Sequence, residues 1–262
     1  MTPTSEGRTV AVVGVGPGLG LEVARVCIRD GASVVLGART HERLTAAAHE
    51  LDPDGNRTAA VAVDVTDQRS CDEFVAAALA RFGRLDGLVV VAAHVTTVGE
   101  AVAIDDDVWH ASFEANVLGP LHLSRAAGEA FTAGGGGSIV LVGTQSAYDP
   151  KPGMAAYGVT KLAAQAGLMH YLAVEWGKRR VRVNTVETSW MLGPLVQGYM
   201  DMMAQSRGIT AAEVIGEIAA AWPIPEMPLD DDVAEAVAFL LSDRARMITG
   251  QTLRVNAGEY LA

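Results

Sequence analysis

Short apolar segments alternate along the chain with longer segments that have helical periodicity. The apolar segments are rich in Val, Leu, Ile and Ala, with few polar residues between them. Such runs are typical of strands that are buried on both faces, as in a parallel sheet covered by helices. We predict strands over 9–14, 33–38, 58–65, 85–93, 138–143, 181–186 and 252–256, and helices over 18–30, 41–50, 67–82, 106–131, 154–178 and 230–242.

The regular order of strand and helix predicts the fold class. Strands joined by right-handed helical crossovers form an open parallel sheet with helices on both faces. The sequence has no linker and no internal repeat beyond this alternation. We therefore expect residues 1–262 to form a single α/β domain, a doubly wound Rossmann fold with a parallel sheet of about seven strands flanked by helices.

Composition and charge narrow the classes of function. Half of the 262 residues are apolar, and the formal net charge is −11 at pH 7. A surface of that charge repels a phosphate backbone, so we expect no nucleic-acid partner. The start MTPTSEGR lacks the apolar core of a signal peptide, and no apolar run reaches the ~18 residues of a membrane span. Cys27 and Cys71 lack disulfide or metal-site spacing, so we expect a cytoplasmic protein without membrane contact or a metal site.

A glycine-rich loop follows the first predicted strand and opens the first predicted helix. In VVGVGPGLG (12–20), glycine occupies positions 14, 16, 18 and 20. A backbone without side chains allows a pyrophosphate to approach the main chain at the positive end of the helix. A glycine pattern alone is weak evidence, but this position in a β-α chain is typical of dinucleotide binding.

The end of the second predicted strand favours one of the two nicotinamide cofactors. An acidic residue at this edge would bind the 2′-hydroxyl of NAD, whereas an arginine can pair with the 2′-phosphate of NADP. Here Ala38 stands where the acid is expected, and Arg39 follows it. We therefore expect NADP, with NAD as the alternative if Arg39 is only a solvated surface cation.

A tyrosine and a lysine stand four residues apart in AAYGVTK (155–161). Positions i and i+4 share one face of a helix, so Tyr157 and Lys161 should lie close together. An ammonium beside a phenol favours the phenolate and lowers its pKa. A tyrosine tuned in this way can exchange a proton with a carbonyl or an alcohol near neutral pH. A lone pair of this kind would be an ordinary surface pair, so its meaning depends on the other motifs.

Four segments occur in a fixed order along the chain. They are VVGVGPGLG (12–20), ANVLG (115–119), YGVTK (157–161) and ITGQTLRVNAG (248–258). In this order they resemble the motifs of the short-chain dehydrogenase/reductase family, over nearly the whole length of the chain. The resemblance implies an enzyme that transfers a hydride between a nicotinamide cofactor and a carbonyl or alcohol substrate.

The resemblance also implies catalytic roles. Tyr157 would be the general acid/base, Lys161 would bind the nicotinamide ribose, and Asn116 would take part in a proton relay to the lysine through water. Thr144 stands where the family has the serine that binds the substrate oxygen. Ser146 is the near alternative, but a two-residue slip would distort the end of the strand.

A further set of positions is implied to bind the cofactor. Asp64 can accept a hydrogen bond from the adenine amino group, although an aspartate at a strand end is also an ordinary turn former. The whole set is Gly14, Gly18, Leu19, Gly20, Arg39, Asp64, Val65, Ala92, Tyr157, Lys161, Thr188 and Met191.

The chain departs from the family motifs at several positions. These are 90–93 (VVAA for NNAG), 188–189 (TS for PG), Pro17 in place of a basic residue, Gly193 in place of a threonine, and Asn256 in place of an aspartate. The changes motivate an alternative, a non-catalytic cofactor-binding regulator or scaffold of the same fold. Intact Asn116, Tyr157 and Lys161 favour the enzyme. A dehydration or epimerisation that uses the same tyrosine remains open.

Residues 189–228 correspond to the helical insertion that covers the active site in this family. The segment is rich in Met and holds two tryptophans, with Arg207 as its only basic residue. If it is a lid, the substrate is a mainly apolar ketone or secondary alcohol, such as a steroid-like, terpenoid or aliphatic acyl compound. A helix that simply faces the core would carry a similar apolar stripe, so both interpretations stand.

The long helices predicted over 106–131 and 154–178, together with the last strand, resemble the assembly surfaces of the family. Apolar residues beyond one helix face need further cover, and symmetric assembly usually supplies it. We therefore expect a homo-oligomer, a tetramer in the first instance, with a monomer as the alternative.

Overall fold

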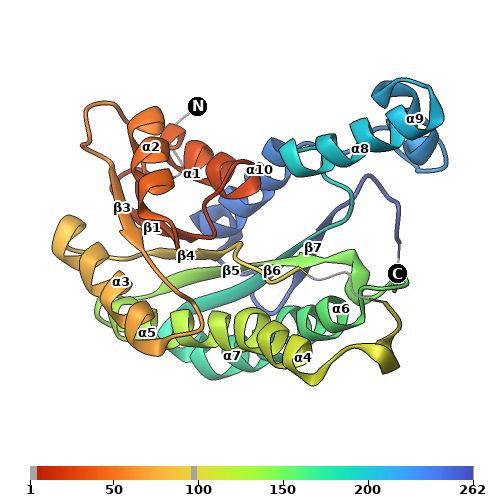
Figure 1. The fold of residues 1–262 in the computed structure, drawn as a ribbon. Coiled ribbons are helices and arrows are strands. Elements are labelled where there is room, and N and C mark those ends of the chain that lie inside the picture. Colours follow the sequence, from red (N-terminus) through yellow and green to blue (C-terminus); the bar gives the residue numbers. More distant parts are fainter. Residues whose placement is uncertain (1–4, 96–98, 262) are drawn as a thin grey trace.

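The computed structural model describes residues 5–95 and 99–261, and its centre is one parallel sheet (Figure 1). Its strands are β1 (Thr9–Val13), β2 (Ser33–Ala38), β3 (Thr58–Ala62), β4 (Gly87–Val90), β5 (Gly137–Thr144), β6 (Val181–Thr188) and β7 (Thr252–Val255). Their order is β3-β2-β1-β4-β5-β6-β7, and every neighbouring pair is parallel. The predicted doubly wound α/β fold is confirmed.

Helices cover both faces of the sheet (Figure 1). On one face lie α1 (Leu19–Arg29), α2 (His41–Leu51) and α10 (Asp230–Leu241). On the other lie α3 (Gln68–Phe82), α4 (Asp106–Phe113), α5 (Gly119–Ala133), α6 (Ala155–Leu162) and α7 (Met169–Trp176). Short 3₁₀ turns occupy Ala101–Ala103, Gln145–Ala147, Gly177–Arg179 and Asp243–Ala245.

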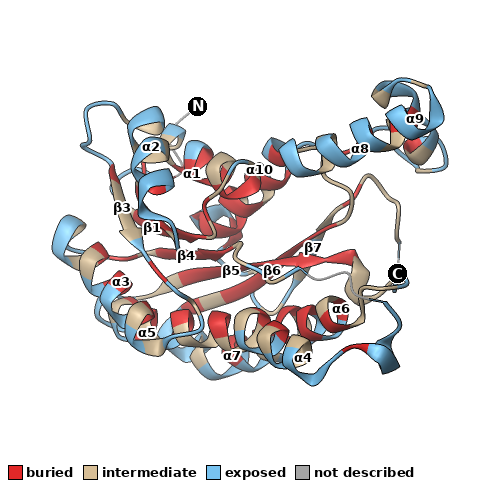
Figure 2. Cartoon of the chain, in the orientation of Figure 1, coloured by how far each residue is buried: buried red, intermediate tan, exposed pale blue. Residues whose placement is uncertain are grey.

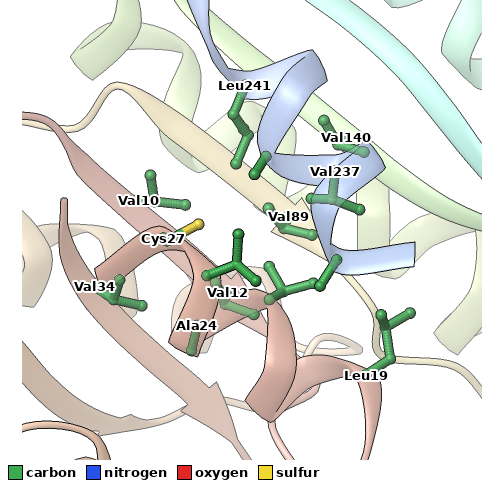
Figure 3. Close-up of a cluster of buried hydrophobic side chains, with 14 of the residues drawn as sticks. Val10, Val12, Leu19, Ala24, Cys27, Val34, Val89, Val140, Val237 and Leu241 are labelled. Atoms are coloured by element: carbon green, nitrogen blue, oxygen red, sulfur yellow. The ribbon is translucent and has the colours of Figure 1, made fainter. Parts of the chain in front are cut away.

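The strands contribute side chains to two hydrophobic clusters, one on each side of the sheet. Along β1, Val10 and Val12 pack toward α1 and α10, while Ala11 and Val13 belong to the opposite cluster. Figure 3 shows the first cluster, where side chains of β1, β4 and β5 meet Cys27 of α1 and residues of α10. Full burial of one such valine or leucine stabilises the fold by roughly 1.5–3 kcal/mol. The unbroken apolar pattern of the strands thus follows from burial on both faces.

Both cysteines are free and buried. Cys27 packs in the cluster on one side of the sheet and Cys71 in the cluster on the other side. Burial raises the pKa of each thiol to about 12, which makes the reactive thiolate scarce at neutral pH. None of the helices in the described part of the chain has the length and apolar character needed to cross a membrane.

Two π-helical turns interrupt what the sequence predicts as two regular helices. One, Glu114–Leu118, joins α4 to α5, and the other, Ala163–Leu168, joins α6 to α7. Each turn holds one buried polar residue, Asn116 or Gln165, whose side chain bonds groups outside its own helix. Pro120 also lacks the N–H that would bond the carbonyl of Asn116 in a regular α-helix. Such π turns often occur at functional sites.

After β6 the chain forms an arm that extends away from the sheet (Figure 1). Its helices are α8 (Pro194–Arg207) and α9 (Ala211–Ala219), and Thr210 and Glu213 form a capping box at the start of α9. The inner side chains of the arm pack into a cluster of their own, centred on Met200, Ala204, Val214 and Met227. Figure 2 shows the outer surface of the arm as largely exposed.

Candidate active site

The glycine loop lies where backbone segments come too close for side chains. Gly14 has φ +100°, and a Cβ there would lie 2.3 Å from the backbone nitrogen of Ala92, just after β4. A Cβ on Gly20 would lie 2.5 Å from the carbonyl oxygen of Gly14. A Cβ on Gly16 would meet no atom within 4 Å. Gly14 and Gly20 are therefore required by the packing of the loop against β4 and α1, whereas Gly16 is not.

A cavity of about 970 Å³ opens beside this loop, at the carboxyl ends of β1 to β4. Among the residues that line it are five of the predicted cofactor positions, Gly14, Arg39, Asp64, Val65 and Ala92. The strand order reverses between β1 and β4, and ligands of doubly wound sheets bind at such switch points. The volume lies at the upper end of the usual range for small-molecule sites. The space and the side-chain-free loop fit a dinucleotide with its pyrophosphate at the N-terminus of α1.

The adenosine side of the cavity holds one cation and one carboxylate. Arg39 is exposed, and no ion pair to it occurs among the described residues. Oδ1 of Asp64 accepts hydrogen bonds from the backbone N–H of Thr66 at 3.0 Å and from its hydroxyl at 2.7 Å. These bonds lower the pKa of Asp64, with a smaller effect of Arg39. Asp64 thus acts as a turn former through Oδ1. The adenine-binding role expected for Asp64 would fall to its other oxygen.

Asp230 lies beside the glycine loop, a position that the sequence analysis did not predict. A Cβ on Gly193 would lie 2.3 Å from its Oδ2, and a Cβ on Gly18 would lie 3.2 Å away. Only 7% of Asp230 is exposed, and its Oδ1 has no hydrogen-bond partner within the described chain. Burial raises the pKa of this carboxyl, and the charges of Glu22 and Asp231 raise it further. Gly193, which replaces the family's threonine, therefore makes room for a buried acid.

The side chain of Thr144 lies near the phenol of Tyr157 and acts on it as a hydrogen-bonding neighbour. Thr144 ends β5 and is 8% exposed, and Tyr157 lies in the first turns of α6. Burial raises the pKa of Tyr157, while the hydrogen bond from Thr144 lowers it. The Thr144 hydroxyl also accepts a bond from the backbone N–H of Ser146 at 3.3 Å. Thr144 is thus the hydroxyl found beside the tyrosine, and its role in place of Ser146 stays a prediction.

The side chain of Lys161 is directed toward strand β5. Its Nζ donates to the carbonyl oxygen of Val142 in β5, and burial lowers its pKa to about 8. Burial raises the pKa of Tyr157. Lys161 thus points toward β5 in this structure, and its expected effect on the pKa of Tyr157 stays a prediction.

Asn116 clamps the loop that follows β4. Its Oδ1 accepts from the backbone N–H of His94 at 2.7 Å, and its Nδ2 donates to the carbonyl oxygen of His94 and to Thr160 Oγ1, each at 3.0 Å. Both amide hydrogens are therefore used away from Lys161. Val90 is buried in the core cluster, so apolar packing and this clamp stabilise the segment where the family has NNAG.

Seven predicted cofactor positions are not among the described residues that line the cavity: Gly18, Leu19, Gly20, Tyr157, Lys161, Thr188 and Met191. Leu19 and Met191 pack against the hydrophobic cluster beneath α1 and α10. The hydroxyl of Thr188, at the end of β6, lies 3.5 Å from the carbonyl oxygen of Gly143.

Sequence reasoning also missed a buried polar group next to Thr144. Gln165, Glu187 and Arg254 form it, and they come from a π turn, from β6 and from β7. Glu187 lies within the strand VRVNTVET, where a charged residue in a sheet buried on both faces was a usable signal. No pattern in the sequence indicated that Gln165 would face the same point.

Comparisons with known proteins agree with this arrangement. The family model for Enoyl-(Acyl carrier protein) reductase matches residues 14–259. An A-factor type gamma-butyrolactone 1'-reductase (1S-forming) of Streptomyces virginiae is 33% identical over 96% of this chain and 95% of its own length. A short-chain type dehydrogenase/reductase of Mycobacterium ulcerans has a TM-score of 0.88 at 31% identity, covering 97% of this chain and 90% of the other.

L-sorbose reductase of Gluconobacter frateurii, solved with NADPH and L-sorbose, has a TM-score of 0.91 at 28% identity and covers both chains completely. The family match spans nearly the whole chain, and the relatives are named as reductases and dehydrogenases. The alternative of a non-catalytic regulator is thereby set aside. The chain belongs to the short-chain dehydrogenase/reductase family of NAD(P)-dependent oxidoreductases.

Proposed function

We propose that this enzyme uses NADP to interconvert a mainly apolar ketone and its secondary alcohol. The observation that carries the proposal is that the side chain of Thr144, at the end of β5, is a hydrogen-bonding neighbour of Tyr157 and lowers its pKa. Two hydroxyls held together at the end of a buried strand can both reach one substrate oxygen. The bound nicotinamide would supply the hydride chemistry.

Each hydroxyl has its own role. Tyr157 donates its proton to the carbonyl oxygen during reduction and takes the proton back during oxidation. Thr144 binds the same oxygen and orients it toward the tyrosine. Because burial raises the pKa of Tyr157, the phenol stays protonated at neutral pH before the cofactor binds. This state suits the donation of a proton to a ketone.

Lys161 and Asn116 would deliver protons to this pair. An ammonium has three hydrogens, and Lys161 uses one of them for the carbonyl oxygen of Val142. The other two can bind the ribose hydroxyls and a water molecule. Pro120 cannot bond the backbone carbonyl of Asn116 as a regular helix would, so this carbonyl is suited to hold that water. In this proposal Asn116 acts through its backbone, since its side chain holds His94.

The cofactor set would divide between the cavity and the region around α1. Arg39 would bind the 2′-phosphate, Asp64 the adenine, and Val65 and Ala92 would line the cavity. Gly14, Gly18, Leu19 and Gly20 would admit the pyrophosphate at the start of α1. Thr188 and Met191 would contact the nicotinamide end only after a local change, since both now pack elsewhere.

The preference for NADPH should depend on Arg39. Because this arginine is exposed at the cavity and has no ion pair within the described chain, its charge is available for a 2′-phosphate. We expect Arg39→Ala to weaken NADPH binding by ~1.5–3 kcal/mol, about 10- to 150-fold, as for loss of a charged hydrogen bond. NADH binding should change little. Fluorescence titration with both cofactors measures this, and equal losses for both would contradict the assignment.

The arm over residues 189–228 should select the substrate, and we treat it as a lid on the single domain 1–262. Trp190 and Tyr199 stack with ring centroids 5.9 Å apart, while Leu195 and Met202 remain exposed. Such a surface suits apolar compounds. A turnover screen of steroid-like, terpenoid, aliphatic and sugar substrates with NADPH and NADH tests this. A preference for sugars would overturn the substrate class, and a preference for NADH would overturn the cofactor.

We also propose a homotetramer in the cytoplasm. The two free thiols are compatible with a reducing compartment. Large apolar side chains are exposed on the layer of α4, α6 and α7, which is typical of a covered face. They are Phe113, Val159, Leu162, Tyr171 and Val174. Light scattering at micromolar concentration should give a mass near four times the 27.3 kDa monomer. A monomer mass would contradict the proposal, and a dimer would contradict the tetramer alone.

A further inference from the structure

A chain of polar groups runs from the half-buried Arg254 in β7 through buried Glu187 and Gln165 to the end of β5. Nε of Arg254 donates to Oε1 of Glu187 at 2.8 Å, and Nε2 of Gln165 donates to Oε2 of the same carboxylate at 3.0 Å. Glu187 and Gln165 are each only 1% exposed. Polar groups buried to this degree need defined partners, so their geometry is strongly constrained.

The amide of Gln165 holds the backbone of Thr144 on both sides. Its Oε1 accepts from the N–H of Thr144 at 2.7 Å, and its Nε2 donates to the carbonyl oxygen of Thr144 at 3.1 Å. Within the described residues, the ladder between β4 and β5 ends at Leu141, so the last residues of β5 pair with β6 but not with β4. The side chain of Gln165 thus supplies bonds that a neighbouring strand would otherwise make.

Two local features make room for this amide. A Cβ on Gly143 would lie 2.7 Å from Oε1 of Gln165 and 2.8 Å from Cγ2 of Thr185. Gln165 also lies in a π turn, where its carbonyl oxygen accepts from the hydroxyl of Thr185 at 2.9 Å. The absence of a side chain at Gly143 leaves space for the amide of Gln165, and the π turn brings Gln165 to that space.

Glu187 decides which way the amide points. Nε2 of Gln165 has two hydrogens, and its two acceptors are the Glu187 carboxylate and the carbonyl oxygen of Thr144. A flipped amide would place its oxygen against the carboxylate and its nitrogen against the N–H of Thr144. Burial raises the pKa of Glu187, and Arg254 lowers it, so the ion pair favours the charged acceptor.

Arg254 in turn lies between two aromatic rings. Its guanidinium is 5.4 Å from the ring centroid of Tyr148 and 5.4 Å from that of Tyr260. Tyr148 follows the turn that begins at Thr144, and Tyr260 lies beyond β7. The polar chain is therefore anchored at the end farthest from Thr144.

We propose that Gln165 is a positioning residue, which fixes the hydroxyl of Thr144 for the substrate oxygen, and that the Glu187–Arg254 ion pair sets the orientation of its amide. The inference rests on the proposed role of Thr144. Gln165 itself touches neither the substrate nor the hydroxyl of Tyr157 in this arrangement. Its effect is transmitted through the peptide of Thr144.

The first test compares Gln165→Leu with a matched control. We expect kcat to fall by about 10- to 100-fold, because a small misplacement of a catalytic group is costly, while the Kd for NADPH changes less than about 2-fold. The rise of alcohol oxidation with pH should also shift upward, as in Thr144→Val, since Tyr157 loses a bond that lowers its pKa. The control is Ser138→Ala, which removes a buried hydroxyl bond of 3.0 Å to Leu240 near the start of β5. It should lower Tm without changing kcat or the pH profile.

A second pair of variants, Gln165→Glu alone and Gln165→Glu combined with Glu187→Gln, tests the inference if Gln165→Leu folds poorly. Gln165→Glu places two carboxylates against each other in a buried site and removes the donor to Thr144, so kcat should fall at least as far. Adding Glu187→Gln relieves the repulsion, because the amide introduced at position 187 can donate to the carboxylate introduced at position 165. We expect the double variant to recover at least about 10-fold of the lost kcat.

The outcomes separate this inference from the proposed function. If Gln165→Leu keeps the parent kcat and pH profile and only lowers Tm, as Ser138→Ala does, Gln165 is merely structural and the inference is overturned. The absence of any recovery in the double variant also overturns the role of Glu187. If Thr144→Val itself retains full kcat, the proposed role of Thr144 fails first, and the inference fails with it.

Discussion

Replacing Tyr157 with Phe should lower kcat by about 10²–10⁴-fold, the usual contribution of a positioned general acid/base. The ring and its packing remain, so the Kd for NADPH should stay close to that of the parent enzyme. The substitution removes only the proton that is exchanged with the substrate oxygen. Steady-state kinetics together with cofactor titration measure both quantities.

The pH dependence gives a second check on Tyr157. Burial raises the pKa of this phenol, so alcohol oxidation, which needs the deprotonated form, should rise with pH in the parent enzyme. Reduction should fall over the same range, because it needs the protonated form. Both trends should disappear from the residual activity of Tyr157→Phe. Near-parent turnover in this variant would refute the assignment of Tyr157 as acid/base.

Thr144→Val should lower kcat by about 10²–10³-fold, as is typical when one hydrogen-bond donor to the reacting oxygen is removed. Valine has nearly the same shape as threonine, so the effect reports on the hydroxyl. Thr144→Ser keeps the hydroxyl and should retain most of the activity. Ser146→Ala should be mild, because the contact of Ser146 with Thr144 uses its backbone N–H. A severe Ser146→Ala combined with a mild Thr144→Val would reverse the assignment.

The elements of the fold could be predicted well because each depends on local pattern. The strand predicted over 33–38 and the helices predicted over 18–30, 41–50 and 67–82 agree with the structure to within one or two residues. The glycine loop was also predictable, since Gly14 and Gly20 serve a backbone approach that recurs wherever this loop follows a strand. Thr144 could be placed from its spacing to Tyr157, and the structure brings the two side chains together.

Other features depend on contacts between distant segments. The π turns at Asn116 and Gln165 keep the apolar pattern of a helix, so periodicity cannot show them. The direction of Lys161 depends on the carbonyl oxygen of Val142, nineteen residues away. Asp230 looks like one of several acids at a helix start, and only the tertiary structure places it against Gly193. In each case a partner far along the chain decides the conformation.

The arm, as the lid proposed above, would affect how substrate choice changes in evolution. Its two ends are tied to each other, since the N–H of Leu192 donates to the carbonyl oxygen of Pro228 at 2.7 Å and Leu192 pairs with Leu229 in a β-bridge. Between these ends the helices pack on their own cluster, apart from the two clusters of the sheet. The arm is therefore a self-contained structural unit. If the arm is the lid proposed above, its length and sequence could be replaced by those of a relative while Thr144, Tyr157 and the cavity keep their own supports, so new specificities could arise without rebuilding the catalytic centre.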